Sequence, residues 1–172
     1  IEMNYMFWQA TSFKQQLCRE PWVQSKATKI EMFTGSSGSI LRRERSAMFA
    51  SKAALKRAVV ACLKLSPEGD CLNSPHGPIV EWDVSSVTDM GKILEDASSF
   101  NGDISEWDVS SVTLMNDMFA SATLFNSDLS KWNVANAKSM HGMFFRAAAF
   151  NGDLSKWDVS SVDQMHKMFS WA

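Results

Sequence analysis

The chain has 172 residues, a formal net charge of −2 and an apolar share of 45%, values typical of a folded protein with a hydrophobic core. No apolar run approaches the ~18 residues that a membrane-spanning helix requires, so the sequence predicts no membrane span. Seven Trp and eleven Phe stand against one Tyr, an imbalance that a repeated motif explains.

Residues 1–39 are predicted to be degenerate repeats, the end of a preceding repeat block. The spacing of Met3, Phe7 and Phe13 matches the spacing of Met115, Phe119 and Phe125 further along the chain. Trp22 takes the place of a repeat tryptophan, and a Gly/Ser-rich turn or short linker follows from residue 35. Because the chain opens and closes inside repeats, we expect it to be an excerpt of a longer protein, and the lack of a signal peptide says little.

Residues 40–78 predict a helical connector or cap that covers the open end of the following repeats. Ser51 can cap the start of a helix, and Pro67 with Gly69 would end it. One face of this helix is apolar at helical spacing, formed by Leu55, Ala58, Val59, Cys62 and Leu63. The segment is also basic, but aromatic residues do not interleave with its Lys and Arg, so we expect no nucleic-acid binding.

Residues 79–172 contain four repeats of 25 residues, the last one truncated. A fixed period of this length is typical of a stacked repeat protein. In residues 103–127, β-favouring residues up to Val109 predict a short strand. The helical spacing from Val112 to Ala122 then predicts a short helix. The expected fold class is therefore an α/β repeat solenoid, a stack of short parallel strands and short helices.

Three columns of large apolar residues recur at the 25-residue step and are predicted to form the core. They are Trp82, Trp107, Trp132 and Trp157; Met90, Met115, Met140 and Met165; and Phe100, Phe125 and Phe150. Exposed tryptophans could stack on sugars, but a strictly repeated aromatic residue more often forms the interior ladder of such a stack.

The repeat motif resembles the BspA-like leucine-rich-repeat family, which occurs in mycoplasma-type surface lipoproteins and in large proteins of protists and algae. The likeness rests on Trp-Asp-Val-Ser-Ser-Val-Thr-x-Met, followed by Met-Phe-x-x-Ala-x-x-Phe-Asn-x-Asp-Leu-Ser-x-Trp. It covers 79–172 closely and 1–36 loosely, and the segment from Leu65 to Cys71 looks like the connector between repeat blocks of the algal type. The resemblance implies a right-handed leucine-rich-repeat-like solenoid used for adhesion or protein binding at the cell surface or outside the cell.

Two sets of polar residues leave alternatives open. Asp103, Asp128 and Asp153 form a column that either binds a cation such as calcium or accepts backbone hydrogen bonds within its own turns, and we favour the turns. Cys62 and Cys71 flank a short turn, so a disulfide is favoured over a buried free thiol, with Cys18 left unpaired.

We predict no catalytic site, no cofactor and no metal site, because no acid, base and nucleophile converge in the sequence and no phosphate loop or zinc motif is present. The expected function is a non-catalytic scaffold that binds a protein or a glycan. The alternative is a structural linker in a filament or large assembly. The basic first part and acidic second part of the chain are either two solvated faces or a source of head-to-tail attraction.

The predicted contact surface has two parts. The main part is the C-terminal end of the stack, at Phe169 to Ala172, where a further repeat or another subunit would pack. The secondary part is the column of charged residues that precede each tryptophan, which changes sign halfway along: Glu81, Glu106, Lys131 and Lys156.

Overall fold

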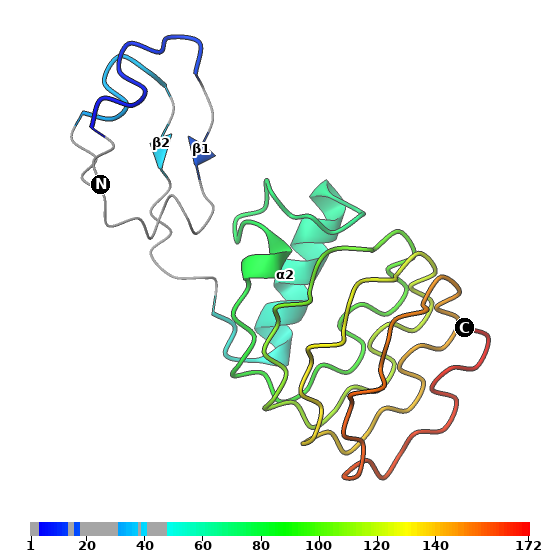
Figure 1. Ribbon diagram of the computed structural model, residues 1–172. Coiled ribbons are helices and arrows are strands. Elements are labelled where there is room, and N and C mark those ends of the chain that lie inside the picture. The colour runs from blue at the N-terminus through cyan, green and yellow to red at the C-terminus, as the bar shows by residue number, and fades with distance from the viewer. Residues whose placement is uncertain (1–3, 14–15, 18–30, 38, 41–47) are drawn as a thin grey trace. The chain divides into compact units, whose positions relative to one another are not determined.

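The computed structural model describes residues 4–13, 16–17, 31–37, 39–40 and 48–172 (Figure 1). It divides into two compact units, Ile1–Arg45 and Ser46–Ala172. We call them the N-terminal unit and the repeat unit and describe each by itself.

The N-terminal unit contains a parallel pair of two-residue strands, β1 (Gln16–Leu17) and β2 (Ser39–Ile40). The ring of Phe7 stacks on the rings of Phe13 and Phe33, at centroid distances of 4.2 and 5.3 Å. The sequence predictions for Cys18 and Trp22 lie outside the described residues.

The repeat unit begins with helix α2 (Lys52–Leu65). Ser51 caps its start by accepting a hydrogen bond from the backbone N–H of Ala54 at 3.3 Å. Its buried face consists of Leu55, Ala58, Val59 and Cys62. This face packs into the same core as the repeats that follow, and Figure 1 shows α2 lying beside the first of them.

The rest of the unit is a stack of four coils that follow the 25-residue period. We call them coil 1 (79–103), coil 2 (104–128), coil 3 (129–153) and coil 4 (154–172). Backbone hydrogen bonds join neighbouring coils in register, such as those from the N–H groups of Met90, Met115 and Met140 to carbonyls of the next coil, each 2.8 Å long. Single-residue parallel bridges run through the stack and link Asp89 to Leu114, Leu114 to Ser139 and Ser139 to Gln164.

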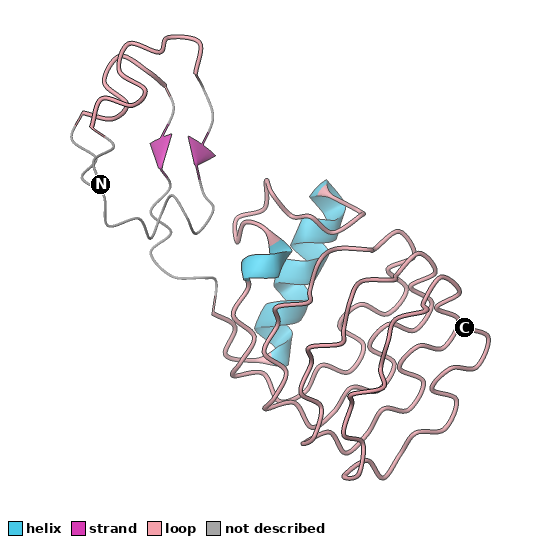
Figure 2. Ribbon diagram, viewed as in Figure 1, coloured by secondary structure: helices cyan, strands magenta, loops and turns pink. Residues whose placement is uncertain are grey.

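The predicted α/β solenoid is wrong. Within the described part of the repeat unit, the regular elements are α2 and the short 3₁₀ helix η1 (Ile79–Glu81). Apart from η1 at the start of coil 1, Figure 2 shows the coils as loops and turns, without the repeated short strands and helices of a leucine-rich-repeat-like stack.

Consecutive tight turns explain why the apolar spacing resembled a helix. In coil 1, the N–H groups of Ile93, Ala97 and Phe100 donate to the carbonyls of Met90, Leu94 and Ala97 respectively, each three residues earlier. The apolar residues at the turn ends point inward, so they follow one another at steps of three, one, three and three residues, as on one face of a helix.

Left-handed backbone at two positions of each coil prevents the turns from merging into a helix. Lys92 and Asp96 have φ values of 63° and 61°, and a residue with positive φ at the third position is characteristic of type II turns. The same two positions are left-handed in the later coils, at Asp117 and Ser121, at Gly142 and Arg146, and at Lys167 and Trp171. Tyr5 with Gln9, and Glu31 with Gly35, repeat this pattern in the N-terminal unit.

Candidate functional site

The tryptophan column lies in the core of the stack. The exposed fractions of Trp82, Trp107, Trp132 and Trp157 are 3, 3, 4 and 9%. Trp82 stacks on Trp107 at a centroid distance of 6.4 Å, and Trp132 stacks on Trp157 at 6.5 Å. Each indole N–H of the last three donates to a backbone carbonyl 28 residues earlier. These rings therefore join coils to one another, and their burial leaves them unavailable to a ligand.

The methionine and phenylalanine columns also face the interior, with one correction. Met90, Met115 and Met140 are fully buried, as are Phe100 and Phe125, and Phe150 is partly buried against the same core. Met165, predicted to be a core residue, is instead 40% exposed. The reason is its place in coil 4, since a methionine of this column is covered by the coil that follows it.

A disulfide joins Cys62 of α2 to Cys71 in the loop before coil 1. Both residues are buried. The bond ties the end of α2 to the segment that leads into the repeats.

The charged column before the tryptophans is paired in its middle. Lys131 forms an ion pair with Glu106 of the preceding coil, with 2.5 Å between Nζ and Oε1. The hydrogen bond from Lys131 to Glu106 raises the pKa of the lysine. Lys156 is exposed in coil 4, and Glu81 is half-buried. The change of sign along the column thus serves contact between coils as well as any contact with a partner.

The aspartate columns accept hydrogen bonds inside their own turns. The carboxylates of Asp103, Asp128 and Asp153 accept from the backbone N–H two residues further on, at 2.9–3.0 Å. The bond from the Ser130 backbone lowers the pKa of Asp128, and the equivalent bond from Ser155 lowers the pKa of Asp153. This arrangement stabilises each charge without a cation.

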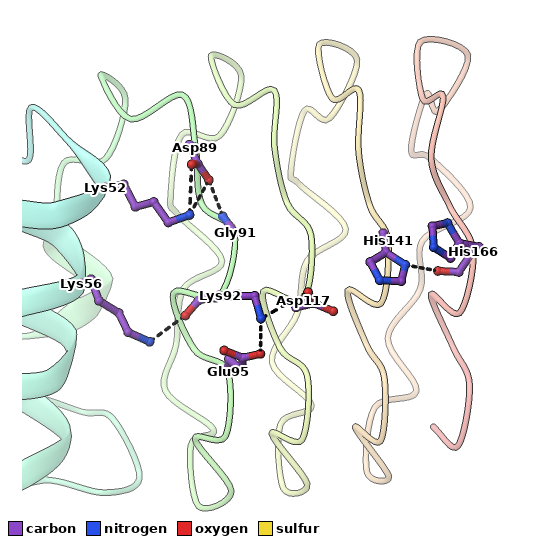
Figure 3. Close-up of polar contacts among 9 residues, drawn as sticks. All are labelled: Lys52, Lys56, Asp89, Gly91, Lys92, Glu95, Asp117, His141 and His166. Atoms are coloured by element: carbon purple, nitrogen blue, oxygen red, sulfur yellow. Dashed lines mark hydrogen bonds and ion pairs between the residues drawn. The ribbon is translucent and has the colours of Figure 1, made fainter.

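Two lysines of α2 cover the start of the stack, which the sequence did not reveal (Figure 3). Lys52 forms an ion pair with Asp89 at 2.9 Å. The ammonium of Lys56 donates to the carbonyls of Lys92 and Ile93, at 2.6 and 3.1 Å. Ile93 occupies the position of Met118, whose carbonyl accepts the N–H of Leu94 from the coil before it. Lys56 therefore replaces a backbone donor, and burial lowers the pKa of its amine.

A hollow of about 370 Å³, with mostly polar residue types in its lining, opens across coils 2, 3 and 4. It is lined by Leu114, Asn116, Lys138, Ser139, His141, Asp163 and Gln164. Beside it the rings of His141 and His166 lie close together, with centroids 3.8 Å apart and planes inclined by 30° (Figure 3). The sequence alone does not reveal this hollow, because its residues are brought together by the register of three successive coils.

A metal site and a membrane-spanning helix each place requirements on the described residues. None of them form a group of three or more His, Cys, Asp or Glu side chains that could hold a metal ion. In the same residues, no helix combines the length and apolar character needed to cross a membrane. The hollow and the outer surface of coil 4 are the features best suited to binding.

In a comparison with protein families, residues 1–41 and 69–172 match the family described as "Mycoplasma protein of unknown function, DUF285". No curated protein and no solved structure matches the chain. The matched residues include all four coils and most of the N-terminal unit, and they leave out α2. Since the match covers well over half of the sequence, the chain belongs to the DUF285 family.

Proposed function

We propose that this protein is a non-catalytic repeat scaffold that binds protein partners at the cell surface or outside the cell, as a BspA-like protein. The observation that carries the proposal is the contrast between the buried repeated side chains and the exposed apolar side chains of coil 4. The large repeated side chains of the coils are used for packing, and within residues 1–172 Met165, Phe169 and Trp171 of coil 4 are exposed by 40, 51 and 80%, where a further repeat or another subunit would pack. A cluster of large apolar side chains at the surface is typical of a protein contact site.

The backbone of coil 4 adds a second reason to place the contact there. In coils 1 to 3, N–H groups at alternate residues donate to carbonyls of the next coil, as those of Met90, Lys92 and Leu94 do. The equivalent groups in coil 4 belong to Met165, Lys167 and Phe169. A partner that offers carbonyls at alternate residues would continue the same ladder.

The extracellular part of the proposal is supported by the Cys62–Cys71 disulfide and by the family match. Structural disulfides persist in oxidising compartments and are rare in the cytosol. Thiol labelling of the protein in its native cells, before lysis, would find both cysteines blocked if this placement is right and reactive if it is wrong.

Binding can be tested with the double variant Phe169→Glu/Trp171→Glu. We expect labelled wild-type protein to bind saturably to intact cells of the organism that makes it, and the double variant to lose this binding. Leu124→Glu is the matched control, because Leu124 is 58% exposed but lies in coil 2. Equal loss in the control, or no saturable binding by the wild type, would count against the proposal.

The alternative is a structural linker that associates head to tail, favoured by the basic first part and acidic second part of the chain. Sedimentation velocity distinguishes it from the first proposal. A linker would show a mass that grows with protein concentration and shrinks with added salt, because charge attraction is screened.

A further inference from the structure

We propose that the hollow of coils 2, 3 and 4 binds a neutral carbohydrate, such as the exposed mono- or disaccharide end of a glycan. This inference rests on the proposed function as a binding scaffold and adds a ligand class and a site to it. The lining of the hollow does not include Phe169 or Trp171, whose apolar side chains carry the proposed protein contact, so the two can be tested separately.

The size of the hollow suits a small ligand. Its volume of about 370 Å³ falls at the lower end of the range of roughly 300–1,000 Å³ found for small-molecule sites. It extends across three successive coils, so its walls are held in place by the hydrogen bonds that join these coils.

The lining contains both hydrogen-bond donors and hydrogen-bond acceptors. Asn116 and Gln164 bring carboxamides, Lys138 an ammonium and Asp163 a carboxylate. Within the described part of the chain, the side chains of Asn116, Lys138 and Asp163 make no hydrogen bond or ion pair with another residue. A sugar hydroxyl both donates and accepts, so a lining of both kinds matches a polyhydroxylated ligand.

One hydrogen bond within the lining fixes the orientation of the Gln164 carboxamide. The nearly buried hydroxyl of Ser139 donates to Oε1 of Gln164 at 3.3 Å. This bond holds the carboxamide of Gln164 by its oxygen and leaves its NH₂ group to donate to a ligand.

The charges of the lining favour a neutral ligand. Lys138 and Asp163 carry opposite charges and lie in the same hollow, and the remaining lining residues are uncharged when His141 is neutral. The carboxylate of Asp163 would repel an anion, and the ammonium of Lys138 would repel a cation. A hydroxyl group can accept from one and donate to the other.

Two surfaces are available to the apolar face of a sugar ring. Leu114 is 39% exposed at the hollow. His141 lies with its Nδ1 2.9 Å from the carbonyl oxygen of His166, and because a carbonyl only accepts, Nδ1 carries the proton. In the neutral ring Nε2 is then the free acceptor.

A peptide fits the hollow less well. Peptide recognition relies on pockets for apolar side chains or on a long row of backbone partners, and the lining holds a single apolar residue, Leu114. We therefore treat peptide binding as an outcome of the test.

The test is an NMR titration of the ¹⁵N-labelled full chain at neutral pH. The probes are glucose, galactose, mannose, N-acetylglucosamine, maltose and lactose, with glucuronic acid as a charged sugar and N-acetyl-glycylglycine amide as a peptide. We expect at least one neutral sugar to shift the amide signals of Lys138, His141 and Gln164 saturably. Shifts with the peptide alone, shifts with glucuronic acid alone, or no shifts at all would overturn the proposal.

Variants locate the site. Asp163→Ala and Gln164→Ala should each weaken sugar binding by about tenfold or more, the equivalent of a lost hydrogen bond to a charged or well-placed polar group. Lys64→Ala is the matched control, since it removes an exposed charge of α2 outside the hollow. Unchanged affinity in both hollow variants, with their spectra showing a folded chain, would overturn the assignment.

The result is separable from the proposed protein contact. Phe169→Glu/Trp171→Glu should leave sugar affinity unchanged while it abolishes binding to cells. Loss of sugar binding in the Asp163 and Gln164 variants, in a chain that does not bind cells, would support the hollow and contradict the protein scaffold.

Discussion

Each tryptophan of the column contributes in two ways to the joining of coils. Its ring is buried, as for Trp132 at 4% exposure, and its indole N–H donates to a carbonyl of the previous coil, Ile104 in this case, at 3.1 Å. A buried indole needs such a partner, because an unsatisfied donor in the core costs free energy. The recurrence of tryptophan at this position follows from needing both a large ring and a donor.

Trp132→Ala should lower the free energy of unfolding by about 3–5 kcal/mol, since it leaves a cavity and an unpaired carbonyl. Urea denaturation followed by circular dichroism measures the change. Trp171→Ala is the control, because Trp171 is 80% exposed and its loss should change stability by less than about 0.5 kcal/mol. Similar small effects of both substitutions would contradict the interior role of the column.

At the scale of the single turn, aspartate stabilises the bends that a coil requires. The Asp128 carboxylate accepts from the Ser130 backbone at 2.9 Å, and Asn133 makes the equivalent bond to the N–H of Ala135 at 3.2 Å. Asparagine thus provides the same acceptor without the charge. The side-chain oxygen, rather than the charge, is the property common to these positions.

These turns predict a sensitivity to acid. The pKa of Asp128 and Asp153 is lowered in the folded chain, so their stabilisation is present above the unfolded value of about 3.9 and is lost as the pH falls through the folded value. The double variant Asp128→Asn/Asp153→Asn should keep its stability near pH 7 and lose less of it on acidification. Urea unfolding at pH 7 and pH 3 measures this difference.

The comparison with alanine separates the acceptor from the charge. Asp128→Ala removes both and should already be less stable at pH 7. If the asparagine double variant loses as much stability in acid as the wild type, the turn carboxylates are not responsible.

At the scale of the element, α2 acts as the first layer of the stack. It buries Leu55 and Val59 against the repeats, and it directs Lys56 at the carbonyl of Ile93. The backbone N–H groups of a helix bond within the helix, so the side chain of Lys56 provides the donor to coil 1 instead.

Lys56→Met keeps the aliphatic stem and removes the ammonium, which leaves the carbonyl of Ile93 without its donor. We expect a loss of about 1–3 kcal/mol in the free energy of unfolding, as for other hydrogen bonds to charged groups. Lys64→Met, at an exposed position of the same helix, should have little effect. Hydrogen exchange should also speed up in coil 1 of the Lys56 variant more than in coil 3, and a uniform increase would contradict local capping.

For the whole molecule, the sequence predicted more about what is buried than about backbone conformation. The 25-residue step placed Trp107, Met115 and Phe125 in columns, and such columns face inward whatever the backbone does between them. The helix expected from Val112 to Ala122 was wrong because turns with three-residue steps produce helical spacing. A left-handed residue such as Asp117, at φ 54°, distinguishes these turns from a helix. An aspartate in the sequence does not by itself predict that its backbone is left-handed.

The α2 helix was predicted because a capping serine, an apolar face and a closing Pro-Gly pair agree locally. The Lys56 contact and the hollow were not, since each depends on how separate segments align. The sequence alone does not single out His141, because Gly91 and Asn116 occupy the same place in the earlier coils. What gives it significance is its position against His166 and beside Asp163 and Gln164, which lie more than twenty residues further on.

The hydrogen bonds between coils run from one coil to the next, and this determines how the stack should respond to force. Within residues 46–172, coil 4 is held by coil 3, so pulling on the two ends of this segment should release coil 4 first and then one coil at a time. A coil of 25 residues extends to about 85 Å when drawn straight and contributes only about 5 Å when stacked. Optical-tweezer traces should therefore show successive gains in length of about 80 Å, and a single step that releases all coils together would contradict this. A chain built in this way lengthens under load in portions, as an extensible tether does.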